Sequence, residues 1–93
     1  MSKTFDLGKV VVTIGISDAI IENDNFARFV NESLVRYIKQ DWGDTCEEDA
    51  KQNDEAVEND DRIHAVYKKD DLTIWIITEW DRSVTTILFP EEY

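Results

Sequence analysis

One stretch of the chain, residues 41–61 with the sequence DWGDTCEEDAKQNDEAVENDD, holds most of the net charge. Ten of its 21 residues are acidic and Lys51 is its only base, so the stretch carries nine net negative charges. The whole chain of 93 residues carries eleven, which leaves only two for everything else. Any fold of this chain must therefore keep the stretch in contact with water, because unpaired carboxylates are costly to bury.

The same stretch carries signals of a helix. Thr45 and Glu48 have the spacing of a capping box, in which each side chain satisfies a free backbone N–H of the first turn. Acidic residues in that turn also suit the positive end of the helix dipole. Ala50 and Val57 supply only a thin apolar stripe. We expect a helix over residues 46–58 that lies on the surface, with most of its circumference in water.

Length and composition predict a single domain over residues 1–93. With 42% hydrophobic and 11% aromatic residues, the composition is that of a globular protein and not of a disordered one. The single cysteine excludes an internal disulfide and fits a reducing compartment. The N-terminal residues lack the apolar core of a signal peptide, and no apolar run is long enough for a membrane span. We therefore expect a cytoplasmic protein.

The net charge of −11 disfavours direct binding to DNA, RNA or an anionic membrane, because their phosphates would be repelled. It favours basic protein partners, including proteins that themselves hold nucleic acid.

The hydrophobic pattern predicts an α+β fold. The β-branched run Val10–Ile14 is typical of a short buried strand, and Ser17 can cap a short helix after it. With Asn25 as its cap, the segment 26–40 has the apolar period of a helix. Three strands then follow, over Arg62–Tyr67, Leu72–Thr78 and Val84–Phe89. We expect a short N-terminal strand, two or three helices and a three-stranded antiparallel meander, with the helices packed on one face.

The sequence offers little support for catalysis or for a metal cofactor. A nucleophilic pair of Cys46 and His64 is conceivable, but nothing in the sequence places the two side chains together. No acidic window has the glycine of a calcium-binding loop, one histidine and one cysteine do not make a zinc site, and no phosphate-binding loop is present. We predict a protein that is not an enzyme and needs no cofactor.

Two of the three tryptophans are candidate aromatic anchors for a partner. Trp75 lies in the middle of an expected strand and is predicted to be in the core. Trp42 adjoins the acidic stretch and Trp80 lies in a turn beside charged residues. Each could simply cover the rim of the core, or could serve as an interface anchor next to a charged patch.

Three segments carry a resemblance to a known family: Leu7–Thr13 (LGKVVVT), Asp41–Asp54, and Trp75–Tyr93 (WIITEWDRSVTTILFPEEY). Together they resemble a family of small acidic proteins encoded on bacterial plasmids, phages and other mobile elements, whose pattern has a small residue at the position of Trp80. The resemblance covers most of the chain and implies a bacterial host cell. In their genetic location on mobile elements and in their negative charge, such proteins are similar to inhibitors of host defence. These include anti-CRISPR and anti-restriction proteins, many of which mimic DNA.

The leading hypothesis is a non-enzymatic, anti-CRISPR-like inhibitor whose acidic helix mimics DNA in the basic groove of a host defence complex, such as a CRISPR effector. The residues expected to bind the partner are the acids of the stretch: Asp41, Asp44, Glu47, Glu48, Asp49, Asp54, Glu55, Glu58, Asp60 and Asp61. The alternative is a regulatory or interaction module of a mobile element that binds a basic protein. The acidic stretch could also be solvated surface that maintains solubility.

Overall fold

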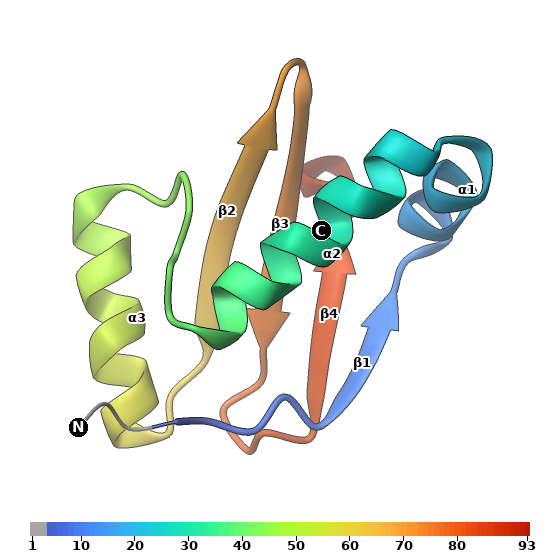
Figure 1. Cartoon of the computed structure of the whole chain (residues 1–93). Helices are drawn as coiled ribbons and strands as arrows, with labels where there is room; N and C mark the ends of the chain where they lie inside the picture. The colour runs from blue at the N-terminus through green and yellow to red at the C-terminus, as the bar shows by residue number, and fades with distance from the viewer. Residues whose placement is uncertain (1–3) are drawn as a thin grey trace.

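The computed structural model describes residues 4–93, which form an α+β structure of a four-stranded sheet and three α-helices (Figure 1). In chain order the elements are β1 (Lys9–Val12), α1 (Ile14–Glu22), α2 (Asp24–Ile38), α3 (Glu47–Asn59), β2 (Ile63–Lys69), β3 (Leu72–Thr78), β4 (Val84–Leu88) and the short 3-10 helix η1 (Pro90–Glu92). The helix α2 crosses the face of the sheet, whereas α3 lies along its β2 side (Figure 1).

The sheet is mixed, with the strand order β1-β4-β3-β2. Neighbouring strands β2, β3 and β4 pair antiparallel, but β1 joins the sheet as a parallel partner of β4. The sheet is therefore not the three-stranded antiparallel meander expected: β2, β3 and β4 pair as predicted, but they belong to a mixed four-stranded sheet. The predicted N-terminal strand also ends earlier than expected, because Ile14 already begins α1.

A close approach of two backbones fixes β1 beside β4. Gly8 has a φ of +64°, and a side chain there would collide with the carbonyl oxygens of Arg82 and Ser83. The N–H of Lys9 donates to the Ser83 carbonyl at 3.1 Å. The conformation and the lack of space both require glycine at this position.

The helices α1 and α2 begin one or more residues before their predicted caps. Thr13 Oγ1 accepts a hydrogen bond from the Ile16 N–H, and Asn23 Oδ1 accepts one from the Phe26 N–H at 3.1 Å. Thr13 and Asn23 are thus the N-caps, in place of the predicted Ser17 and Asn25. Both belong to the residue types that compete best for this position, so the local pattern alone could not separate them.

A chain of buried hydroxyl groups links α2 to the sheet. Tyr37 Oη lies 2.8 Å from Thr78 Oγ1, which lies 2.7 Å from Thr85 Oγ1. Thr85 in turn donates to the Leu7 carbonyl at 2.7 Å. Each hydroxyl has one proton, so Thr78 donates to Thr85 and Tyr37 donates to Thr78. The chain joins α2, β3, β4 and the segment before β1, and each of its three hydroxyls has a partner.

The core lies between α2 and the sheet, and Phe29 of α2 is 6% exposed within it. Phe29→Ala should lower the free energy of unfolding by about 3–5 kcal/mol, because it removes a buried ring and leaves a cavity. Val35→Ala, on an exposed part of the same helix, should change it by less than about 0.5 kcal/mol. Urea unfolding of the two variants and the wild type measures both. A loss below about 1 kcal/mol for Phe29→Ala would mean that this face of α2 does not form the core.

Candidate protein-interaction site

The acidic helix α3 turns its inner side toward the core and the rest of its surface to water. Asn53, Ala56 and Val57 are buried, whereas all ten acidic residues of the stretch 41–61 are exposed. Cys46 is the N-cap and makes no side-chain capping bond. The predicted capping box is wrong because the Thr45 hydroxyl is used elsewhere: it donates to the Trp42 carbonyl and accepts from the Val66 N–H.

This use of Thr45 is part of a larger arrangement that covers the outer edge of β2. His64 is bracketed by Asn53, whose Nδ2 donates to its carbonyl at 2.9 Å and whose Oδ1 accepts from its N–H at 3.1 Å. The Val66 carbonyl accepts from the Asp44 N–H at 2.8 Å. An edge strand normally presents these groups unpaired to the solvent or to another chain. Here the segment between α2 and β2 occupies them.

Three of the acids expected to bind a partner also make contacts that hold this segment in place. Asp41 accepts two hydrogen bonds from the Arg36 guanidinium, at 2.9 and 3.2 Å, and these lower the pKa of its carboxyl. Asp44 accepts from the N–H of Lys68 at 2.8 Å, and Asp54 accepts from the indole of Trp42 at 2.9 Å. Their carboxylates therefore contribute to the fold as well as to the surface charge.

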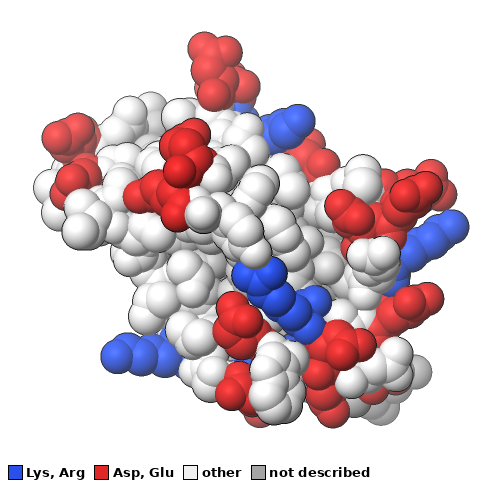
Figure 2. All heavy atoms as spheres, turned by 180° about the vertical axis from the view of Figure 1, so that it is seen from behind, with Lys and Arg blue, Asp and Glu red and all other residues white. Residues whose placement is uncertain are grey.

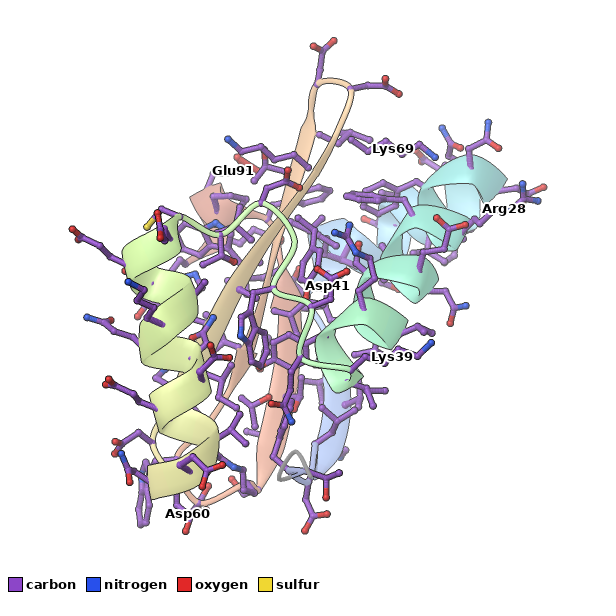
Figure 3. All side chains as sticks on the ribbon, turned by 60° about the vertical axis from the view of Figure 1, so that its left-hand side comes forward. Arg28, Lys39, Asp41, Asp60, Lys69 and Glu91 are labelled. Atoms are coloured by element: carbon purple, nitrogen blue, oxygen red, sulfur yellow. The ribbon has the colours of Figure 1, made fainter. Side chains whose placement is uncertain are left out.

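The remaining acids of the stretch lie on α3 and at its end. Glu47, Glu48, Glu55 and Glu58 recur at helical spacing on the side away from the buried residues, with Lys51 among them. Lys51 approaches Glu47 only at 4.0 Å, and both side chains are more than 70% exposed. Side chains of α3 project outward along its whole length in Figure 3, down to Asp60 at its end.

The C-terminal end of α3 is tied to the turn between β3 and β4. Asp60 adopts the left-handed conformation that commonly ends a helix. The guanidinium of Arg82 donates to the carbonyls of Ala56 at 2.9 Å and Asp61 at 2.6 Å. A cation at this end also suits the negative pole of the helix dipole. Arg82 and Asn53 thus fix α3 at two points along its length.

The three tryptophans lie in three different environments, and only Trp80 lies where the sequence indicated. Trp42 is only 6% exposed and packs edge-on against Tyr37, so it belongs to the core and is not available as a surface anchor. Trp80 is 66% exposed in the β3–β4 turn, where it is accessible to a partner. Trp75, expected in the core, is only partly buried on the opposite face of the sheet.

That opposite face carries an aromatic cluster that sequence reasoning missed. The ring of Trp75 contacts those of His64 and Tyr93, with centroids 4.5 and 5.5 Å apart. The guanidinium of Arg62 lies over the Tyr93 ring at 5.5 Å. Seen from this side, the face is a mixture of uncharged surface and acidic side chains, with Lys and Arg side chains near its centre (Figure 2). The strand alternation was the available signal, since Trp75 and Ile77 point away from Ile74 and Ile76.

His64 borders a hollow of about 280 Å³ beside this cluster, which Asp49 and Arg62 also line. Burial and the Arg62 charge lower the pKa of the imidazole, against the opposing effect of Asp49. Cys46 is exposed and is not among the residues that line the hollow, so the structure does not bring the Cys46–His64 pair together there.

Within residues 4–93, no group of three or more His, Cys, Asp or Glu side chains is arranged to hold a metal ion. No helix of the described chain is long and apolar enough to span a bilayer. Comparison of the chain with models of protein families, with curated proteins and with solved structures finds no match. The resemblance to proteins of mobile elements accordingly stays a prediction.

Asn53→Ala tests the closure of the β2 edge. The change should lower the free energy of unfolding by about 1–3 kcal/mol, because it leaves the N–H and the carbonyl of His64 without partners. Asn59→Ala, at an exposed position at the end of the same helix, is the matched control and should have little effect. Denaturant unfolding gives both values. Equal stability of the two variants would show that Asn53 does not support the edge.

The environment of His64 predicts a pH effect on stability. Its pKa is lowered in the folded state, so the unfolded chain binds the proton more readily. The free energy of unfolding should therefore decrease as the pH falls below about 6.5, the ordinary histidine value, toward the folded pKa. His64→Gln should remove this slope. The NMR titration midpoint of His64 provides the direct check, and a midpoint above 6.5 would contradict the proposed environment.

Proposed function

We propose that this protein is a non-enzymatic inhibitor that binds a basic nucleic-acid-binding groove of a host defence complex and excludes DNA from it. A CRISPR effector is the leading candidate for that complex. The exposed acidic side of α3 would enter the groove in place of a nucleic-acid strand. The observation that carries the proposal is the placement of Glu47, Glu48, Glu55 and Glu58 on one exposed side of a fixed helix.

The spacing of the charges supports this proposal. The 13 residues of α3 extend over roughly 20 Å at about 1.5 Å per residue. The helix carries six carboxylates: Glu47, Glu48, Asp49, Asp54, Glu55 and Glu58. Four of them, Glu47, Glu48, Glu55 and Glu58, lie on the side that would enter the groove, which gives one negative charge per roughly 5 Å, against ~3.4 Å per charge along one strand of duplex DNA. A groove that holds one phosphate strand would thus meet a linear charge density of the same order.

The rigid attachment of α3 supports it further. Asn53 holds the helix to β2, and Arg82 of the β3–β4 turn donates to the Ala56 carbonyl in its last turn. A binding surface that is already ordered loses less conformational entropy when a partner binds. The exposed glutamates would therefore present their charges at nearly fixed positions, as the phosphates of a duplex do.

A second candidate function is an interaction module of a mobile element that binds a basic protein without displacing nucleic acid. The aromatic cluster of Trp75 and Tyr93 with the adjoining Arg62 favours it, because Trp, Tyr and Arg are the residues enriched at interface hot spots. The exposed Trp80 adds a further aromatic side chain on the surface. Simultaneous binding of the partner to this protein and to DNA would distinguish this function from the first.

The charge-reversed variant Glu47→Lys, Glu48→Lys, Glu55→Lys, Glu58→Lys tests the leading proposal. The probe is a set of purified, guide-loaded CRISPR effector complexes whose binding to labelled target duplex is measured by gel shift. Wild-type protein should release the duplex from a susceptible complex, and raising the salt concentration should weaken this effect, since surface charges are screened over ~8 Å at physiological ionic strength. The variant should lose the effect. Its stability should change little, because the relief of self-repulsion is opposed by the loss of the favourable dipole interaction of Glu47 and Glu48 at the start of α3.

The matched control reverses four exposed acids outside the stretch, Asp6, Asp18, Glu22 and Glu32. It changes the net charge by the same amount and should retain the inhibition. Equal losses in both variants would mean that net charge, and not α3, is responsible. A ternary complex of effector, duplex and wild-type protein would exclude DNA mimicry.

A further inference from the structure

The two edges of the sheet differ in whether their outward backbone groups have hydrogen-bond partners. The outward backbone groups of His64 and Val66 on β2 are paired with Asn53, Thr45 and Asp44. The other edge strand, β1, has β4 as its only strand partner in the described chain. One edge is thus covered by its own chain, and the other is not.

The outer side of β1 is formed by Val10 and Val12. The N–H groups of Lys9 and Thr13 donate to the carbonyls of Ser83 and Ile87, each at 3.1 Å. Alternate residues of a parallel strand hydrogen bond to the same neighbour, so the N–H and C=O groups of Val10 and Val12 point to the open side. Within residues 4–93, no hydrogen bond reaches them from that side.

The side chains of this edge are also incompletely covered. Val10 is 41% exposed and Val12 is 40% exposed, and Ile14 directly after the strand is 81% exposed. By register, Val10 and Val12 lie on the same face as the buried Thr85 and Ile87. The helix-covered face of the sheet therefore continues onto β1 without a helix above it. Open backbone groups and exposed β-branched side chains together are the features of a strand that pairs with another chain.

The charge at the β1 edge indicates which chain pairs with it. Residues 4–14 contain one acid, Asp6, and one base, Lys9, and Glu92 accepts a hydrogen bond from Thr13 at the end of the strand, so this edge carries little net charge, whereas the β2 edge carries the acidic stretch. Electrostatic attraction would bring a basic partner to the acidic β2 side and not to this weakly charged edge. A second copy, with its net charge of −11, is repelled by the acidic side and can approach here.

We propose that β1 pairs antiparallel with β1 of a second copy, which makes a twofold dimer with a continuous eight-stranded sheet. With Val11 on the twofold axis, Val10 faces Val12 of the partner copy, and the two pairs exchange four backbone hydrogen bonds. The four valines pack together on the helix-covered face, and Lys9 meets Thr13 of the partner copy, so no like charges are opposed. This dimer does not depend on the proposed function.

The dimer also keeps the two acidic helices apart. They lie beyond the two outermost strands, which are seven strand spacings of ~4.8 Å, or roughly 34 Å, from each other. This is about four times the ~8 Å over which charges are screened at physiological ionic strength. The dimer would therefore carry two acidic helices, one at each end of the sheet.

Sedimentation equilibrium over a wide concentration series tests the dimer. Wild-type protein should shift from 10.8 kDa toward twice that mass as the concentration rises. Val10→Lys with Val12→Lys should weaken the association by about 100-fold or more, because four lysines would meet at the interface. The control Ile21→Lys with Val35→Lys adds the same charge at exposed apolar positions on α1 and α2 and should still dimerise.

A wild-type protein that remains monomeric throughout, also at raised salt, would overturn the proposal. So would a dimer that the two lysines on β1 do not weaken. A loss of dimer in the control variant as well would point to a different interface and would equally overturn it.

A crosslink keeps the test decisive if the lysine variant does not fold. Residues on the twofold axis of such a pair have Cα atoms about 4.5 Å apart, within disulfide range. Val11→Cys in a Cys46→Ser background should form a disulfide-linked dimer with oxidised glutathione at least about 10-fold faster than Asn59→Cys in the same background. Equal rates would contradict the β1–β1 pairing.

Discussion

The outward N–H and C=O groups of an edge strand need hydrogen-bond partners. This constraint governs the acidic half of the molecule. On β2 the N–H and C=O groups of His64 are taken by a single buried amide, that of Asn53. This contact fixes the rotation of α3, because Asn53 must face the strand. Once it does, Ala56 and Val57 enter the core and Glu47, Glu48, Glu55 and Glu58 face the water. The position of the exposed charge thus follows from a requirement of the sheet.

The acidic stretch consequently has two kinds of carboxylate. Those of Asp41, Asp44 and Asp54 accept hydrogen bonds from Arg36, the Lys68 N–H and Trp42, and so hold the segment to the rest of the fold. Those on the outer side of α3 concentrate like charge, which costs stability. The division has a functional consequence. Variants of the first kind are expected to change stability and binding together, whereas variants of the second kind should change binding with little change in stability.

The sequence predicted the elements better than their arrangement. Period and composition located β3 at its observed bounds and α3 within a residue, because both signals are local. The parallel pairing of β1 with β4 depends on contacts between segments far apart in the sequence, so no local turn signal predicts it. The same holds for the sites. Exposure of the acids on α3 was predictable from charge. The burial of Trp42 depends on its bond to Asp54, which the sequence does not show. The alternation along β3 indicated that Trp75 lies opposite Ile74 and Ile76, but not which of the two faces α2 covers.

The central claim is that the sheet has one edge closed by its own chain and one edge open. Amide hydrogen exchange, followed by NMR at a concentration low enough to keep the protein monomeric, tests it most directly. The outward-facing amides of His64 and Val66 on β2 should exchange slowly, because Asn53 and Thr45 accept their hydrogen bonds. Those of Val10 and Val12 on β1 should exchange nearly as fast as loop amides. Fast exchange at His64 and Val66, or protection of Val10 and Val12 in the monomer, would contradict the account.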